Sequence, residues 1–186
     1  RNTYVLDGTP RVLKPHFTFQ GYRYIRIDEF PAEEEIRPEN FVSVAISSDL
    51  KQTGSFLCGN EKVNRLYRNT LWGQRSNFID IPTDCPQRDE RLGWLGDAQV
   101  FIRTAAINCD VRRFFEKWLN DVMSEQNADG GIYGVVPKVP GRGTKVSTAW
   151  GDATVICPWE LYRAYGDRDL LARHFPMMQK WVDYVH

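Results

Sequence analysis

The chain changes character near residue 55, and this change limits the folds that it can adopt. Beyond Gly59, apolar residues recur at steps of three and four, which is the period of an amphipathic helix. Before residue 55, Gly and Pro separate short runs rich in β-branched and aromatic residues, which favour strands. These runs are TYVL (3–6), HFTFQ (16–20), YRYIRI (22–27) and FVSVAIS (41–47). The sequence therefore predicts the end of an antiparallel β domain over residues 1–54, followed by part of an all-α domain over residues 55–186.

The clearest helical pattern is DVRRFFEKWLNDVMSEQ at 110–126, with Asp110 as the expected N-cap and its apolar residues on one face. Asn60 is the expected N-cap of another helix. Short connections between such helices predict antiparallel neighbours, four or five in number, with no strand between them. The stretch 127–149 is rich in Gly and Pro and is predicted to be a long, functional loop. The other expected helices cover 60–72, 152–165 and 167–186.

Composition excludes several classes of function. The 24 Lys and Arg residues balance the 24 Asp and Glu residues, so charge does not favour a nucleic-acid partner. No apolar run reaches the roughly 18 residues that a membrane-spanning helix needs. The sequence leaves the cellular compartment and the oligomeric state open, and its start, RNTYVLDG, suggests a piece of a longer protein. The cysteines form no metal-binding spacing and are expected to be buried free thiols; they are Cys58, Cys85, Cys109 and Cys157.

The stretch DCPQRDERLGWLGD at 84–97 concentrates carboxylates beside guanidinium groups, together with Trp94 and two glycines. Hydrolysis of the acetal bond between sugars needs two carboxyl groups, one of which donates a proton. A carboxyl group keeps a proton near neutral pH only where burial or nearby negative charge favours its neutral form. Glu90 has both apolar and acidic neighbours in the sequence, whereas Arg88 and Arg91 would act in the opposite direction if they paired with it. A solvated loop with weak local ion pairs is the alternative interpretation.

A longer string, FIDIPTDCPQRDERLGWLGDAQVF at 78–101, closely resembles the signature of the α-L-rhamnosidases of glycoside hydrolase family 78. Four other stretches agree with this family in the same order, so the resemblance covers most of the chain. They are HFTFQGYRYIRI at 16–27, LYRNTLWGQRSNF at 66–78, VVPKV at 135–139 and AWGDA at 149–153.

The resemblance implies a fold and a reaction. The fold would be the end of a β-sandwich domain followed by the first helices of an (α/α)6 toroid that binds sugar at its centre. The reaction would be inverting hydrolysis of terminal α-L-rhamnosides, without a cofactor or a metal ion. Rhamnose-containing glycosides or polysaccharides would be the substrates.

The resemblance also implies roles for individual residues. Glu90 would be the general acid, and three residues would hold the rhamnose hydroxyl groups, namely Asp84, Arg88 and Asp97. Trp94 would offer the sugar an apolar wall, and Trp150 would either line the same subsite or pack in the core. Asp152 is a weaker candidate that could instead cap a helix.

One departure from the family pattern is that no stretch matches the context of the general base, which is a later Glu in the toroid. We therefore expect the 186 residues alone not to hydrolyse rhamnosides. Two alternatives stay open at this point. An (α/α)6 glycosidase could act on another sugar, and a non-catalytic carbohydrate-binding module could use the same aromatic residues.

Overall fold

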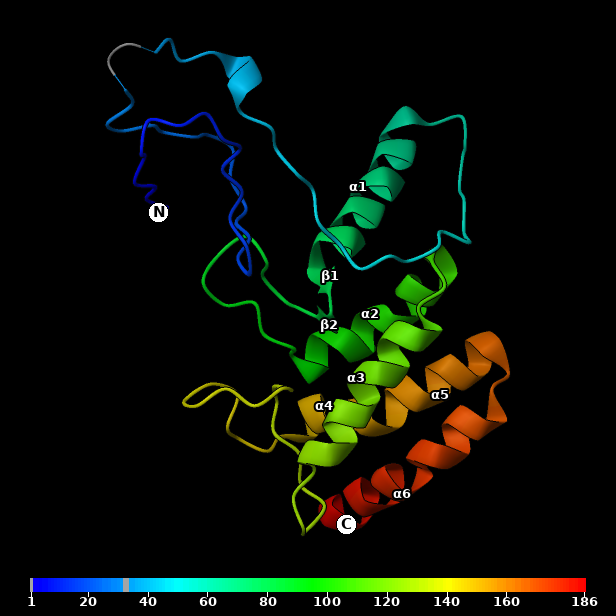
Figure 1. The fold of residues 1–186 in the computed structure, drawn as a ribbon. Helices are drawn as coiled ribbons and strands as arrows, with labels where there is room; N and C mark the ends of the chain where they lie inside the picture. The colour runs from blue at the N-terminus through cyan, green and yellow to red at the C-terminus, as the bar shows by residue number, and fades with distance from the viewer. Residues whose placement is uncertain (1, 32–33) are drawn as a thin grey trace.

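A computed structural model describes residues 2–31 and 34–186 (Figure 1). The N-terminal segment extends away from a stack of helices, and the C-terminus lies at the far end of that stack (Figure 1). The helices are a short 3-10 helix η1 (Pro38–Asn40), α1 (Glu61–Asn77), α2 (Leu95–Asn108), α3 (Arg112–Glu125), α4 (Thr148–Gly151), α5 (Ala153–Tyr165) and α6 (Arg168–Val185). The two strands are β1 (Phe78–Ile79) and β2 (Ile81–Pro82).

The hydrophobic core lies among α2, α3, α5 and α6. Helix α5 packs against α2, α3 and α6, so it occupies the middle of this group. Helix α3 buries most of the predicted apolar face, with Phe115 and Trp118 fully enclosed, whereas Met123 is exposed. The ring of Phe78 stacks on Phe114 with centroids 4.6 Å apart, which attaches β1 to the same core. Packing of amphipathic faces therefore holds the helical part together, as the periodicity predicts.

The predicted strands before residue 55 are not confirmed. Over residues 2–31 and 34–54 the structure shows only one isolated bridge, between Gln52 and Cys109. A strand is stable where its backbone groups pair with a neighbour, and a sandwich also needs a second sheet over its apolar face. The predicted runs are mostly exposed and have neither. The structure thus leaves the β-sandwich part of the expected fold unconfirmed.

Residues 48–54 connect this segment firmly to the helices. The N–H of Ser48 donates to the carbonyl of Phe78 at 2.8 Å, and the N–H of Gly54 donates to the carbonyl of Asn108 at 2.9 Å. A side chain at Gly54 would place its Cβ 2.1 Å from the carbonyl oxygen of Ile107, so the backbones can approach this closely only at a glycine.

The predicted helices at 60–72, 110–126, 152–165 and 167–186 are confirmed, with differences at their ends. The side chain of Asn60 accepts hydrogen bonds from the N–H groups of Lys62 and Val63, as an N-cap does. Helix α3 begins one residue later than expected. Asp110 still accepts a hydrogen bond from the N–H of Arg112, at 3.2 Å, although Val111 occupies the N-cap position.

Two elements were not foreseen. Between α1 and α2, strands β1 and β2 form an antiparallel hairpin whose turn residue, Asp80, has a φ of 65°, so the expectation of no strand between helices is wrong. Helix α2 was also missed, although Leu95, Ala98, Ile102 and Ala105 recur on one buried face. The hairpin ends just before the charged stretch at 84–97, and α2 begins within it, so the two elements fix both ends of that stretch.

Within the described residues, no helix combines the length and the apolar character needed to cross a membrane. The four cysteines are free thiols there, as expected. Only Cys109 and Cys157 are buried, whereas Cys58 and Cys85 are half-buried.

Candidate active site

The loop between β2 and α2 is closed at its base by Asp84. The N–H of Asp84 donates to the carbonyl of Leu92 at 3.0 Å, and the N–H of Leu92 donates back to Oδ1 of Asp84 at 2.9 Å. Partial burial would raise the pKa of Asp84, but the backbone N–H groups of Leu92 and Cys85 outweigh it and lower the pKa. Asp84 therefore carries negative charge and also holds the two ends of the loop together.

Glu90 lies inside this loop with both of its carboxylate oxygens engaged. Nη2 of Arg88 donates to Oε2 at 2.6 Å, and Nε1 of Trp94 donates to Oε1 at 3.2 Å. The side chain of Glu90 is 18% exposed, whereas that of Arg88 is 64% exposed. The structure thus brings together three of the predicted residues, with Glu90 at the centre.

Arg91, which follows Glu90 in the chain, does not pair with its carboxylate. Arg91 donates from Nε to the carbonyl of Pro86 at 3.3 Å, and its guanidinium lies 4.7 Å from the ring centroid of Phe19. Its φ of 57° is uncommon for a residue other than glycine and costs roughly 1–2 kcal/mol. Of the two arginines considered from the sequence, only Arg88 contacts Glu90.

Trp94 and Trp150 form one aromatic surface. Their ring centroids lie 6.3 Å apart in an edge-to-face arrangement. Two glycines make room for them: a Cβ at Gly96 would lie 3.0 Å from Nε1 of Trp150, and a Cβ at Gly134 would lie 3.3 Å from Cζ3 of Trp94. Trp150 is 38% exposed, so it is not simply a core residue.

The predicted loop at 127–149 supports this surface. Val135 forms a bridge with Trp94, and the N–H of Val136 donates to the carbonyl of Gly93 at 2.9 Å. A Cβ at Gly93 would lie 2.0 Å from the carbonyl oxygen of Val136, so this close approach requires glycine. The carbonyl oxygen of Val136 also accepts a hydrogen bond from Nε1 of the buried Trp118 at 3.0 Å. The loop therefore fixes Trp94 against the core, although its last residues, 148–149, belong to α4.

Asp97 lies in the first turn of α2. Loss of hydration, and then the negative charges of Asp84 and Glu90, raise the pKa of Asp97 above its ordinary value. Three carboxyl groups therefore share one electrostatic environment. Asp152, the weaker candidate, occupies the N-cap position of α5 without a capping hydrogen bond from its side chain. Its Oδ1 instead accepts a hydrogen bond from the indole N–H of Trp181 at 3.0 Å.

A cavity of about 450 Å³ between α1 and α2 borders two of these carboxyl groups, those of Asp84 and Asp97, whereas Glu90 is not among its lining residues. Asp84 and Asp97 line it, together with the aromatic rings of Phe78 and Phe101 and the polar side chains of Thr70 and Thr83. A second hollow, of about 550 Å³ between α5 and α6, contains none of the predicted residues. The carboxylate cluster, and not the larger hollow, is therefore the candidate active site.

Donor atoms of Asp84, Cys85 and Glu90 lie within 4.8 Å of one another, which is close enough for a metal ion. Nη2 of Arg88 already lies 3.3 Å from Sγ of Cys85 and 2.6 Å from Oε2 of Glu90. A guanidinium therefore supplies the positive charge at this point.

Comparison with known families decides where the chain belongs. Residues 51–186 match the bacterial alpha-L-rhamnosidase 6 hairpin glycosidase domain, and residues 1–47 match the bacterial alpha-L-rhamnosidase concanavalin-like domain. The chain belongs to the bacterial α-L-rhamnosidase family. The helices are thus part of a six-hairpin glycosidase domain, as expected from the family signature.

Individual relatives agree with this family. An alpha-L-rhamnosidase from Formosa agariphila is 46% identical over 90% of the chain, and one from Streptomyces avermitilis is 40% identical over 99%. The chain spans 18% of the length of each of these rhamnosidases. Among solved structures, the native rhamnosidase from Aspergillus terreus is 41% identical, with a TM-score of 0.85 over 92% of the chain and 20% of its own.

A rhamnosidase structure with bound sugar is also similar. The Streptomyces avermitilis enzyme complexed with L-rhamnose is 45% identical, with a TM-score of 0.71 over 74% of this chain and 13% of its own.

Proposed function

We propose that this chain is the part of an inverting α-L-rhamnosidase that carries the general acid, Glu90. The observation that supports this role best is the position of Glu90, half-buried between Arg88 and Trp94 and beside Asp84 and Asp97. Hydrolytic glycosidases need one carboxyl group that donates a proton to the leaving oxygen, and Glu90 lies close to the other two carboxyl groups of this site. The rhamnosidase relatives support rhamnose as the sugar.

In the proposed reaction, Glu90 donates its proton to the glycosidic oxygen as the bond between that oxygen and the anomeric carbon of rhamnose breaks. A water molecule attacks the opposite face and loses its proton to a second carboxylate, which inverts the anomeric centre. The two carboxyl groups of an inverting enzyme lie roughly 6.5–9.5 Å apart, with the water between them. We propose that the second carboxylate, the general base, comes from outside residues 1–186.

Binding of the sugar changes the surroundings of Glu90 in this proposal. Two donors on a carboxylate stabilise its charged form, and Arg88 is such a donor in the structure. Rhamnose hydroxyl groups offer Arg88 alternative acceptors, and its exposed guanidinium can turn toward them. When Arg88 and the carboxylates of Asp84 and Asp97 hold the sugar, Oε2 of Glu90 is released to carry a proton.

Trp94 and Trp150 would provide the apolar side of the subsite. Sugar rings present C–H faces that pack on aromatic rings, and rhamnose carries a methyl group where many hexoses carry a hydroxymethyl group. The indole N–H of Trp94 is committed to Glu90, so its ring can face the sugar while its polar edge holds the acid.

We also propose that residues 1–54 belong to a β-sandwich domain and residues 55–186 to the (α/α)6 toroid. The match of residues 1–47 to a domain other than the one matched by residues 51–186 supports a division near this point.

The decisive experiment compares Glu90→Gln with Asp89→Asn in the complete enzyme. Asp89 is an exposed carboxylate of the same loop, so its variant controls for loss of charge. With Glu90→Gln, we expect cleavage of natural rhamnosides to fall about 10²- to 10⁴-fold, because their leaving oxygen needs a proton. Aryl rhamnosides with acidic phenol leaving groups should lose much less. Equal activity of Glu90→Gln and Asp89→Asn on natural rhamnosides would refute the role of Glu90.

The sugar itself is tested with aryl glycosides of rhamnose, glucose and fucose. Release of rhamnose alone supports the proposal, whereas preferred release of another sugar would assign the domain to a different glycosidase. Binding of rhamnose without turnover, undiminished by Glu90→Gln, would instead indicate a carbohydrate-binding module.

A further inference from the structure

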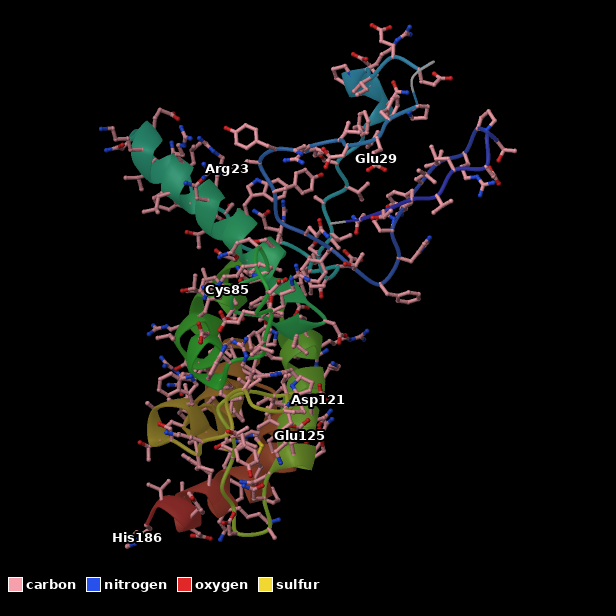
Figure 2. All side chains as sticks on the ribbon, turned by 90° about the vertical axis from the view of Figure 1, so that its left-hand side faces the viewer. Arg23, Glu29, Cys85, Asp121, Glu125 and His186 are labelled. Carbon is pink, nitrogen blue, oxygen red and sulfur yellow. The ribbon has the colours of Figure 1, made fainter. Side chains whose placement is uncertain are left out.

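The N-terminal segment contacts the loop that carries Glu90. Side chains of this segment are mostly exposed, but Phe19 is half-buried beneath the guanidinium of Arg91, at 4.7 Å. Two residues farther along, the backbone of Gly21 comes so close to Gln87 that a Cβ there would lie 2.7 Å from Cβ of Gln87. Figure 2 shows Cys85, at the start of this loop, at the level where the N-terminal segment approaches the helices. Both contacts therefore join the segment to the same loop.

Arg91 transmits this contact to the acid. It follows Glu90 directly, and its side chain spans the loop to donate to the carbonyl of Pro86. Its backbone has a φ of 57°, a conformation that persists only where the surrounding structure holds it. The next residue, Leu92, is fixed by both hydrogen bonds to Asp84. Arg91 and Leu92 therefore fix the backbone immediately after Glu90.

The contact also keeps a second positive charge away from the acid. Arg88 already donates to Glu90, whereas Arg91 is occupied by the ring of Phe19 and the carbonyl of Pro86. An arginine stacked on an aromatic ring gains cation–π attraction in one fixed orientation. Without the ring, Arg91 is free to turn toward the carboxylate beside it, and a second guanidinium there would oppose its role as a proton donor.

We propose that Phe19 is a positioning residue for the general acid: by stacking on Arg91, it holds Glu90 in place and keeps Arg91 from pairing with it. The N-terminal segment is then a functional part of the active site. This inference rests on the proposed function of Glu90, and its test must separate the two.

The experiment uses the complete enzyme with Phe19→Ala and Phe17→Ala as a matched pair. Phe17 is an aromatic residue of the same segment and is fully exposed, so its loss should change nothing. With Phe19→Ala, we expect kcat on natural rhamnosides to fall about tenfold. This is less than the full contribution of general acid catalysis, about 10²- to 10⁴-fold, because Glu90 is misplaced and not removed. On aryl rhamnosides with acidic leaving groups kcat should fall less than about twofold, and KM should stay the same on both. Phe19→Tyr keeps the ring and should restore kcat.

Arg91→Ala provides a second, independent test. It removes the side chain that holds Glu90 in place but also the guanidinium that could pair with it, so it should show the same leaving-group dependence with a loss no larger than that of Phe19→Ala. The double variant Phe19→Ala/Arg91→Ala should be no worse than Arg91→Ala alone, because Phe19 then has no guanidinium to hold. Equal losses on natural and aryl rhamnosides, or a Phe19→Ala enzyme that behaves like Phe17→Ala, would overturn the inference. If Glu90→Gln shows the leaving-group dependence while Phe19→Ala does not, only this inference fails. If Glu90→Gln shows none, the proposed function itself fails.

Discussion

Trp94 donates its indole N–H to Oε1 of Glu90 at 3.2 Å, so the aromatic residue expected to pack on the sugar also orients the expected acid. The two side chains come from opposite ends of a short stretch, because Glu90 belongs to the loop and Trp94 directly precedes α2. The close approach of the 127–149 loop to Gly93 keeps Trp94 in this position.

The first prediction separates these two roles of Trp94. Trp94→Phe keeps an apolar ring but removes the N–H that orients Oε1 of Glu90, and correctly placed general acid catalysis contributes about 10²- to 10⁴-fold. We expect kcat on natural rhamnosides to fall roughly 10- to 100-fold while KM changes little. Trp72→Phe serves as the control, because Trp72 is exposed on α1 and stacks with Arg75. A large rise in KM with unchanged kcat would show that Trp94 contributes only to sugar binding.

The second prediction concerns the base of the loop. Asp84→Ala removes the acceptor for the N–H of Leu92 and should lower the free energy of unfolding by about 1–2 kcal/mol. Asp84→Asn keeps an oxygen at that position and should retain most of the stability while losing the charge. Denaturant unfolding of both variants measures the difference. Equal destabilisation by the two would mean that the charge, and not the hydrogen bond, holds the loop.

Asp84 also makes stability depend on pH. Because the native surroundings lower the pKa of Asp84 below 3.8, the folded protein favours the ionised form. The resulting stabilisation is present above this ordinary value and is lost as the pH falls through the lower native pKa. The acid limb of the unfolding curve should therefore be less steep in Asp84→Asn than in the parent protein.

The third prediction compares a glycine with no space for a side chain, Gly93, and a glycine with open space around it, Gly73. Gly93→Ala would place a Cβ 2.0 Å from a backbone carbonyl, so we expect a loss of several kcal/mol or displacement of the 127–149 loop. Gly73→Ala, within α1, meets no atom within 4 Å and should stabilise the protein by about 0.5–1 kcal/mol. Thermal unfolding of the two variants gives both values. A neutral Gly93→Ala would contradict the close approach of the loop.

The fourth prediction follows from His174, which is fully buried in α6. Burial lowers the pKa of His174 below its ordinary value of 6.5, and Arg173 acts in the same direction, although the carbonyl of Leu170 and the charge of Glu116 oppose it. The folded state thus favours neutral His174. The contribution of neutral His174 to the stability of the folded protein is fully present above pH 6.5. It decreases as the pH falls below this value, because the unfolded state binds the proton more readily.

His174→Gln should therefore reduce the loss of unfolding free energy between about pH 7 and about pH 5. His16→Gln is the control, since His16 is exposed and its variant should keep the slope of the parent. An unchanged slope in His174→Gln would show that other groups cause the acid sensitivity.

The sequence alone determined those helices that are specified by neighbouring residues. The apolar face of α3 repeats at steps of three and four, and Asn60 caps α1 with its own side chain, so both depend on neighbours within one turn. The family signature likewise fixed which residues are candidates for the site. The strands expected before residue 55 remain a prediction, because a strand depends on distant partners for its hydrogen bonds.

Only the tertiary structure decided how the site residues are used. It pairs Glu90 with Arg88 and stacks Arg91 on Phe19, whereas the sequence left open which of the two arginines contacts Glu90. It also joins Trp150 to Trp94 across more than fifty residues, over a surface that Gly96 and Gly134 leave open. The physical reason is that helix periodicity and capping act over a few residues, whereas contacts between distant segments exist only once the core has brought them together.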